Sequence, residues 1–496
     1  MKNFNRKMAK GAAWMVLFKL VHRSLSLIST VILARLLLPA DFGLIALAMS
    51  IIAALELLSA FSFDIALIQD QKSGRKEYDT VWTFNVLFGV GSGLILLLLA
   101  SPAAEFYADP RLELVMFALA AFPLLGGLQN IGVIEFRKEM QFNKEFGFLA
   151  AQKLAGFSIT IPLAFVYENY WALVAGMLGA QLVGVLLSYL LHPYRPRFSL
   201  AAAHKLFHFS KWLLINNVLF FFRLRSASFI IGKTADADAL GKFTIATEIS
   251  SLPNEFVAPV NRAVFPGYAK MSHELDMLRQ GFLDVIAAIS MVVLPAAFGI
   301  AATAELLVPV LLGEKWLDVI PLIQILAVFA AITALQTNTG YVFLALGKPK
   351  TLTVLGTLYL FILIPLLLWL TPSAGATGAA WAYLLSAMTL MPLYFHQLLR
   401  NLKLGITKLA SVIWRPAIAT TIMLVVVMAS MDLSFPFTGA YNKILHLLTS
   451  ILIGAISYSV TLLALWYLSA CPPGPEQYVI EKVLRTIRGR LSLGQP

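Results

Sequence analysis

The stretch "AAWMVLFKLVHRSLSLISTVILARLLLPADFG" (residues 12–43) decides the fold class. Its apolar run is long enough to cross a bilayer as a helix, which takes about 20 residues. Similar runs recur along nearly the whole chain, and they are far too long for the strands of about ten alternating residues in a membrane barrel. With 59% hydrophobic and 13% charged residues, the sequence predicts an all-α polytopic membrane protein.

Apolar runs bounded by proline, glycine and charged residues predict fourteen spans. They lie near residues 13–37, 42–62, 80–100, 113–134, 146–166, 170–191, 211–231, 243–268, 282–303, 319–345, 351–371, 376–398, 413–431 and 444–468. No small-residue cleavage site follows the basic N-terminus, so an uncleaved first span is expected rather than a signal peptide. The single cysteine, Cys471, has no disulfide or metal-ligand partner, and no metal is expected.

Lysine and arginine gather in alternate connections between these spans. With a cytoplasmic N-terminus, and with basic residues at the edge of a span counted with the adjoining segment, 26 of the 38 basic residues fall in inward segments, 6 in outward segments and 6 within spans. Because short cytoplasmic loops collect positive charge, both termini are predicted to be cytoplasmic. The net charge of +12 then reflects orientation and attraction to anionic membrane lipids, and no nucleic-acid partner is expected.

The chain also repeats itself weakly. A shift of 198 residues lays "RLLLPADFGLIALA" (35–48) on "KTADADALGKFTIA" (233–246) and matches Gly43 with Gly241. Six predicted spans separate the copies, which indicates parallel repeats with a central site between two lobes. The predicted domains are an N-lobe (1–192), a cytoplasmic inter-lobe loop (193–210), a C-lobe (211–400), two further spans (401–470) and a basic cytoplasmic tail (471–496).

Basic side chains lie inside several predicted spans, where a charge normally faces a partner or a water-filled cavity. Lys19 and Arg23 are four residues apart and share one face of the first span. In the seventh span, its repeat counterpart, Asn216 and Arg223 share a face, whereas Arg225 lies roughly 200° around the helix and is expected to meet another helix. Since Lys19, Arg23 and Arg223 have no acidic residue within a turn of their own helix, they favour a cationic cavity for an anionic substrate.

Acidic side chains occur at lipid level as well, namely Glu56, Glu248, Glu255 and Asp284. The eighth span carries Glu248, Glu255 and Arg262 at intervals of seven residues, and Pro253 and Pro259 interrupt it. The alternative interpretation of all these groups is mutual pairing that only holds helices together. Neither a catalytic carboxylate pair with a nucleophile nor a Ser/His/Asp set can be placed at one membrane face, so no catalytic residue and no enzyme is predicted.

Five segments carry a family resemblance: "ILARLLLPADFGLIALA" (32–48), "ALIQ" (66–69), "FPGYAKMS" (265–272), "AAFGIAATAELLVPVLLGEKWLDVIPLIQILAV" (296–328) and "ALGKPK" (345–350). With them the chain resembles the polysaccharide transporter family of lipid-linked oligosaccharide flippases, in the multidrug/oligosaccharidyl-lipid/polysaccharide exporter superfamily. The pattern is most similar to the exopolysaccharide or colanic-acid exporter type. "LLGEKW" (311–316) is the most specific segment, and the last four spans match only in hydropathy.

The resemblance implies two six-helix lobes around a central cationic cavity, two extra C-terminal helices, and a multi-pass protein of the bacterial inner membrane. It implies movement of undecaprenyl-pyrophosphate-linked oligosaccharide units by alternating access, without a cofactor. The expected substrate-binding residues, placed by helix position, are Lys19, Arg23, Asn216, Arg223 and Arg262. A proton or sodium gradient is the implied energy source, with Glu56, Glu248, Glu255 and Asp284 as candidates. A monomer is expected, with membrane lipids, a polysaccharide polymerase and a chain-length regulator as candidate partners.

Three other functions stay open on the sequence alone. A net acidic cavity would favour a multidrug or cation exporter of the same superfamily. A large outward domain would favour a membrane polysaccharide polymerase or glycosyltransferase, although the predicted outward loops are short. A cavity sealed by mutual salt bridges would favour a scaffold subunit for other synthesis proteins.

Overall fold

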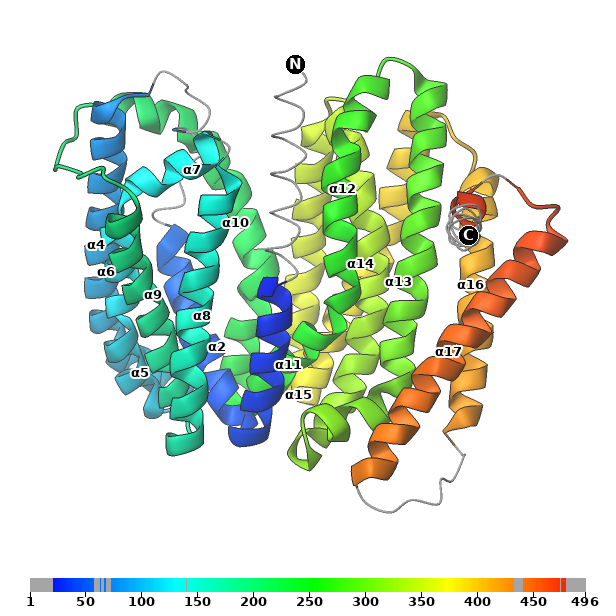
Figure 1. Cartoon of the computed structure of the whole chain (residues 1–496), viewed down its shortest axis with the longest axis horizontal. Coiled ribbons are helices and arrows are strands. Elements are labelled where there is room, and N and C mark those ends of the chain that lie inside the picture. Colours follow the sequence, from blue (N-terminus) through cyan, green and yellow to red (C-terminus); the bar gives the residue numbers. More distant parts are fainter. Residues whose placement is uncertain are drawn as a thin grey trace, which may run out of the picture. The chain divides into compact units, whose positions relative to one another are not determined.

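The computed structural model describes residues 21–57, 63, 67, 73–139, 141–431, 440–472 and 474–478. Every regular element among these residues is a helix (Figure 1). Contacts within the chain divide it into two compact units, one of residues 1–244 and 367–376 and the other of residues 245–366 and 377–496. The lobe boundaries expected from the repeat stay a prediction.

The first unit contains a helical segment at residues 21–36 and a series of helices packed side by side. These are α2 (Pro39–Glu56), α4 (Arg75–Tyr107), α5 (Arg111–Leu119), α6 (Ala121–Leu128), the short η2 (Ile131–Val133) and α7 (Ile134–Lys138), α8 (Phe142–Tyr167), α9 (Trp171–Leu191) and α10 (Ala203–Thr234). Local sequence sets their ends. Pro39 stands in the first turn of α2, where its missing N–H costs nothing, and the Asp41 carboxylate accepts from the Leu38 N–H at 2.9 Å.

The second unit takes up the chain within α11 (Ala237–Ser250), which begins in the first unit. It continues through α12 (Leu252–Met271), α13 (Leu275–Leu311), η3 (Glu314–Val319), α14 (Ile320–Ala345), α15 (Pro349–Leu402), α16 (Ile406–Ser430) and α17 (Ala440–Leu468). Residues 367–376 of α15 belong to the first unit. At 54 residues, α15 would be about 80 Å long, far more than the ~30 Å core of a bilayer. Gly375, with φ 55° and ψ −136°, interrupts it and separates the two spans expected at 351–371 and 376–398.

The prediction of an all-α membrane protein is confirmed. Ten helices among the described residues are long and apolar enough to cross a membrane, with α15 counted once. The eighth predicted span is divided, because α11 ends at Ser250 and α12 begins at Leu252 with Pro253 in its first turn. The second predicted interruption is absent: Pro259 lies inside α12. The total of fourteen spans is compatible with this arrangement and remains a prediction.

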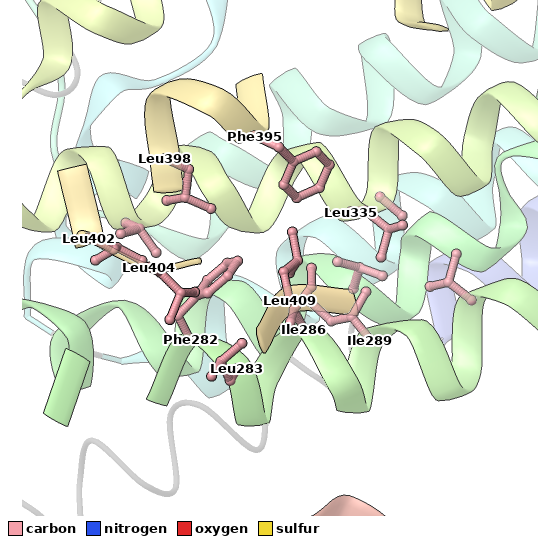
Figure 2. Close-up of a cluster of buried hydrophobic side chains, with 14 of the residues drawn as sticks. Phe282, Leu283, Ile286, Ile289, Leu335, Phe395, Leu398, Leu402, Leu404 and Leu409 are labelled. Carbon is pink, nitrogen blue, oxygen red and sulfur yellow. The ribbon is translucent and has the colours of Figure 1, made fainter. Parts of the chain in front are cut away.

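Each unit has a hydrophobic core of its own. In the second unit, Phe282, Ile286 and Ile289 of α13 pack with side chains from α14, α15 and α16 (Figure 2). In the first unit, Tyr78 and Trp82 of α4 belong to a smaller buried cluster. These cores hold the helices that carry the candidate site residues.

An extended segment, residues 192–202, runs from α9 to α10 across α4, and we refer to it as the strap. It is bonded to successive turns of α4: the Arg197 N–H donates to Asp79 Oδ1 at 2.8 Å, and the Ser199 N–H donates to Thr83 Oγ1 at 2.9 Å. The Tyr194 hydroxyl donates to the same Asp79 oxygen at 2.7 Å. Burial and this hydrogen bond raise the pKa of Tyr194, so its hydroxyl stays protonated as a donor at physiological pH.

Candidate functional site

The predicted basic face of the first span is only partly described. Lys19 lies outside the described residues, whereas Arg23 lies in the helical segment 21–36, half-buried and with its Nε atom shielded from solvent. Asn216 and Arg223 both lie in α10, where Arg223 is exposed. The set of these residues as a substrate site therefore stays a prediction.

Arg225 of α10 is half-buried and interacts electrostatically with Glu56, which is the last residue of α2. The structure thus brings together two charged residues that are far apart in the chain, both within the first unit. The partner of Arg225 could not be predicted, because spacing along one helix does not indicate which neighbouring helix a residue faces.

Glu56 also lines a cavity of about 280 Å³ inside the first unit. Asn85 and Ser92 of α4 and Gln181 of α9 supply the polar part of its wall. Asn85 lines a second cavity as well, described below. Amide and hydroxyl groups that line a cavity within a bundle of membrane helices can hold water or an ion beside a carboxylate. These uncharged polar residues were not predicted, because a neutral amide or hydroxyl within an apolar run is a weaker signal than a charge.

The charges of the eighth predicted span fall on two helices. Glu248 belongs to α11, whereas Glu255 and Arg262 belong to α12. Ser251, with φ −80° and ψ −6°, separates the two helices, so the seven-residue spacing does not run along one continuous helix. Glu248 and Glu255 are both half-buried.

Asp284 of α13 is exposed and lines a cavity of about 410 Å³ in the second unit. Its Oδ1 accepts from the Gln280 amide at 2.8 Å. Three basic residues line the same cavity: Arg279, Lys408 and Arg415. The Arg415 guanidinium meets the Glu476 carboxylate at 3.0 Å, both side chains being buried, so the segment after α17 is anchored on α16 by a buried ion pair.

Two glycines matched by the 198-residue repeat touch each other within the first unit. A Cβ atom on Gly43 of α2 would lie 1.6 Å from the Ala237 carbonyl oxygen, and one on Gly241 of α11 would lie 1.8 Å from the Pro39 carbonyl oxygen. Pro39 and Ala237 are themselves 198 residues apart. The contact is therefore reciprocal, as expected for repeat-related helices crossing on a local twofold axis, and only glycine permits it.

No group of three or more metal-ligating side chains is found in the part of the chain that the structure describes. The arrangement that is described offers basic groups, carboxylates and amides within a helical bundle.

The family model for polysaccharide biosynthesis proteins matches residues 32–321, more than half of the chain. Among curated relatives, the lipopolysaccharide biosynthesis protein WzxC of Escherichia coli (strain K12) is 25% identical over 393 residues, which cover 77% of this chain and 79% of that protein. The succinoglycan biosynthesis transport protein ExoT of Rhizobium meliloti (strain 1021) is 25% identical over 476 residues, covering 92% of this chain and 93% of that protein.

Among solved structures, the lipid II flippase MurJ in an inward closed conformation superimposes with a TM-score of 0.75. The superposition covers 91% of this chain and 98% of that one at 14% sequence identity. At such low identity the likeness establishes a shared fold, and it supports the fold class that the sequence predicts.

Proposed function

The chain belongs to the family of polysaccharide biosynthesis proteins, and from this premise we propose that it is a flippase for undecaprenyl-pyrophosphate-linked oligosaccharide units. The observation that carries the proposal is the similarity to ExoT, named as a transport protein, along 92% of this chain and 93% of that one. The fold shared with MurJ, named as a flippase of lipid II, supports the same class of substrate. The translocated units would be used in the biosynthesis of a bacterial exopolysaccharide, O-antigen or capsule.

The proposed mechanism is alternating access by two lobes related by the internal repeat. The pyrophosphate and sugars cross in an aqueous interior, while the polyprenyl chain stays in lipid, because moving phosphate charge through hydrocarbon would be prohibitive. Lys19, Arg23, Asn216, Arg223 and Arg262 are proposed to hold the anionic head. The reciprocal glycine contact supports the repeat on which this mechanism depends.

We propose coupling to a proton or sodium gradient rather than to a cofactor. Of the four carboxylates considered, Glu56 has the strongest support, since it lines a cavity whose wall includes the amide side chains of Asn85 and Gln181. Asp284 is exposed and lines a cavity with Asp276 and three basic residues. Two of these bases are already paired, Arg279 with Asp276 and Arg415 with Glu476. Glu248 and Glu255 stay candidates for ion coupling because both side chains are half-buried.

The proposed setting is the bacterial inner membrane, with both termini in the cytoplasm and the chain acting as a monomer. A polysaccharide polymerase and a chain-length regulator are proposed partners, since the translocated units would be polymerised on the far side. The exporter and polymerase alternatives receive no specific support from the described residues.

The test is translocation of a lipid-linked oligosaccharide in liposomes containing the purified protein. We expect the native protein to translocate and Arg23→Ala and Arg223→Ala to reduce the rate at least tenfold each, because each loses a charge-assisted contact to phosphate. Arg35→Ala is the matched control, being an exposed arginine near the end of the first helical segment. No translocation by the native protein would refute the function, and undiminished translocation by both variants would refute the cationic site alone.

A further inference from the structure

A second cavity inside the first unit lies where α4, α6, α7 and α8 meet, and its volume is about 270 Å³. Its polar lining includes Asn85, Gln129, Arg137 and Glu145, and its apolar lining includes Phe136 and Phe148. This volume is close to the lower end of the ~300–1,000 Å³ range of ligand pockets. It therefore suits a single small ring rather than an oligosaccharide.

Glu145 is the feature that points to a ligand. The residue is only 5% exposed, and the Arg137 guanidinium contacts its Oε1 twice, through Nη2 at 2.6 Å and through Nε at 2.8 Å. Its other oxygen, Oε2, is buried and has no hydrogen-bond partner. A buried carboxylate oxygen without a donor costs free energy, which a donor from a molecule in the cavity would recover.

Two amide side chains of the lining are equally available. Asn85 and Gln129 make no side-chain hydrogen bond among the described residues, although each carries one acceptor and two donors. Together with Glu145 Oε2 they form a set of donors and acceptors beside an apolar wall. Neighbouring hydroxyl groups on a ring, each both donor and acceptor, match such a set.

The charges in the cavity decide between ligand classes. Glu145 and Arg137 neutralise each other at contact distance, so an anion would meet the carboxylate and a sodium ion would meet the guanidinium. A neutral ligand meets neither repulsion. We propose that this cavity is a binding site for a neutral pyranose ring, held by Glu145, Asn85 and Gln129.

The neutral hydroxylated character of the ligand follows from the cavity, whereas its identity as a sugar rests on the proposed function. The site is distinct from the basic residues proposed for the pyrophosphate. It would bind one sugar of the substrate inside the first unit and so contribute to discrimination between repeat units, because a hydroxyl lost or inverted would leave buried polar groups unpaired.

The test is saturation-transfer NMR with methyl pyranosides and the purified full-length protein in phosphatidylcholine nanodiscs, which contain no sugar-headed detergent. We expect at least one of the methyl glucoside, galactoside and mannoside to bind, and glycerol, the polyol of lipid head groups, to bind at least tenfold more weakly because it is not preorganised. Glu145→Gln and, independently, Gln129→Ala should weaken pyranoside binding at least tenfold. Glu139→Gln is the matched control, since it makes the same change at an exposed position of the same connection.

Three outcomes would overturn the site. They are no saturation transfer from any pyranoside, undiminished transfer in both variants, and a sodium-dependent rise in thermal stability that Glu145→Gln abolishes, which would mark a cation site. Thermal unfolding of each variant shows that it is folded. Because binding is measured without translocation, a native protein that translocates lipid-linked oligosaccharide but binds no pyranoside refutes this inference alone, whereas pyranoside binding without translocation refutes the proposed function.

Discussion

Asp79 is the residue on which the strap depends. Its carboxylate is only 6% exposed and accepts from the Tyr194 hydroxyl and the Arg197 N–H, while the Arg75 guanidinium lies 3.5 Å away. Hydrogen bonds to a charged acceptor contribute about 1.5–3 kcal/mol each, more than bonds between neutral groups. Asp79 thus accepts two of the hydrogen bonds that hold the strap on α4, beside the one from the Ser199 N–H to Thr83.

We expect Asp79→Ala to release the strap without unfolding the helices. Trypsin does not cleave before proline, so of the strap's two arginines, Arg195, which precedes Pro196, is resistant and Arg197 is the cleavable site. Loss of both bonds, about 3–6 kcal/mol together, should raise the population of the open strap, and with it the cleavage rate after Arg197, by about a hundredfold or more. Mass spectrometry of the fragments over time measures this rate.

The control is Glu105→Ala, which removes an exposed carboxylate near the other end of α4. Its cleavage rate should equal that of the native protein. Equal rates for Asp79→Ala and the native protein would mean that packing of Trp82 and Phe198, whose ring centroids lie 5.0 Å apart, holds the strap by itself.

At this scale the sequence predicts candidate residues better than it predicts their partners. Glu56 and Arg225 stand out in the sequence because they are charged residues within predicted membrane spans. Their interaction with each other could not be predicted, because it joins two helices separated by more than a hundred residues. Glu145 was not predicted as a site residue, because it precedes the apolar run expected at 146–166. In the structure α8 begins earlier, at Phe142, and carries Glu145 into the interior.

Among the elements, α2 and α11 come into direct backbone contact where they cross at two glycines. Gly43 and Gly241 each face a backbone carbonyl from the other helix, and neither carbonyl can rotate away as a side chain could. Adding a methyl group must therefore move the helices apart. Overpacking of this kind typically costs about 1–3 kcal/mol.

We expect Gly43→Ala and Gly241→Ala each to lower the thermal unfolding temperature, and the double variant to lower it by less than the sum of the two. The first methyl group already separates the helices and makes room for the second, so the effects are coupled rather than additive. Thermal unfolding in one detergent, followed by intrinsic fluorescence, measures all three. Gly91→Ala is the control, since a Cβ atom there would meet nothing within 4 Å.

If the double variant loses the full sum, the two glycines act independently and the reciprocal crossing is not a single contact. The outcome bears on the repeat as well, because the pairing of residues 39 with 241 and 43 with 237 follows directly from the 198-residue offset.

Element positions were largely predictable, because a membrane span is defined by one strong signal, a long apolar run. Each predicted span has a helical counterpart among the described residues, the first one in the segment 21–36. The departures come from weaker signals. Pro253 breaks a helix whereas Pro259 stays within one, since a proline can be accommodated where neighbours satisfy the freed carbonyl. The strap could not be foreseen because its hydrogen bonds go to side chains of a distant helix.

For the whole molecule, the distribution of basic residues predicts the direction in which the chain crosses the membrane. Cys471 is the single cysteine and is exposed just beyond α17, so the native protein carries one reporter for this orientation. Lys443, near the start of α17, is exposed and pairs with Glu314 at 2.5 Å. As α17 has 29 residues, about 43 Å, these two positions should lie on opposite sides of a bilayer.

We expect a membrane-impermeant maleimide to leave Cys471 unlabelled in intact spheroplasts and to label it after permeabilisation, because the basic tail that follows favours the cytoplasm. In a Cys471→Ser background, Lys443→Cys should show the reverse, being labelled in intact spheroplasts, which also proves that the reagent reaches the protein. Gel mobility or mass after labelling gives the fraction modified. Labelling of both positions from outside would mean that α17 does not cross the membrane. Labelling of Cys471 alone would mean that the orientation is the reverse of the predicted one. The basic segments would then face away from the cytoplasm, and the proposed direction of transport would be reversed as well.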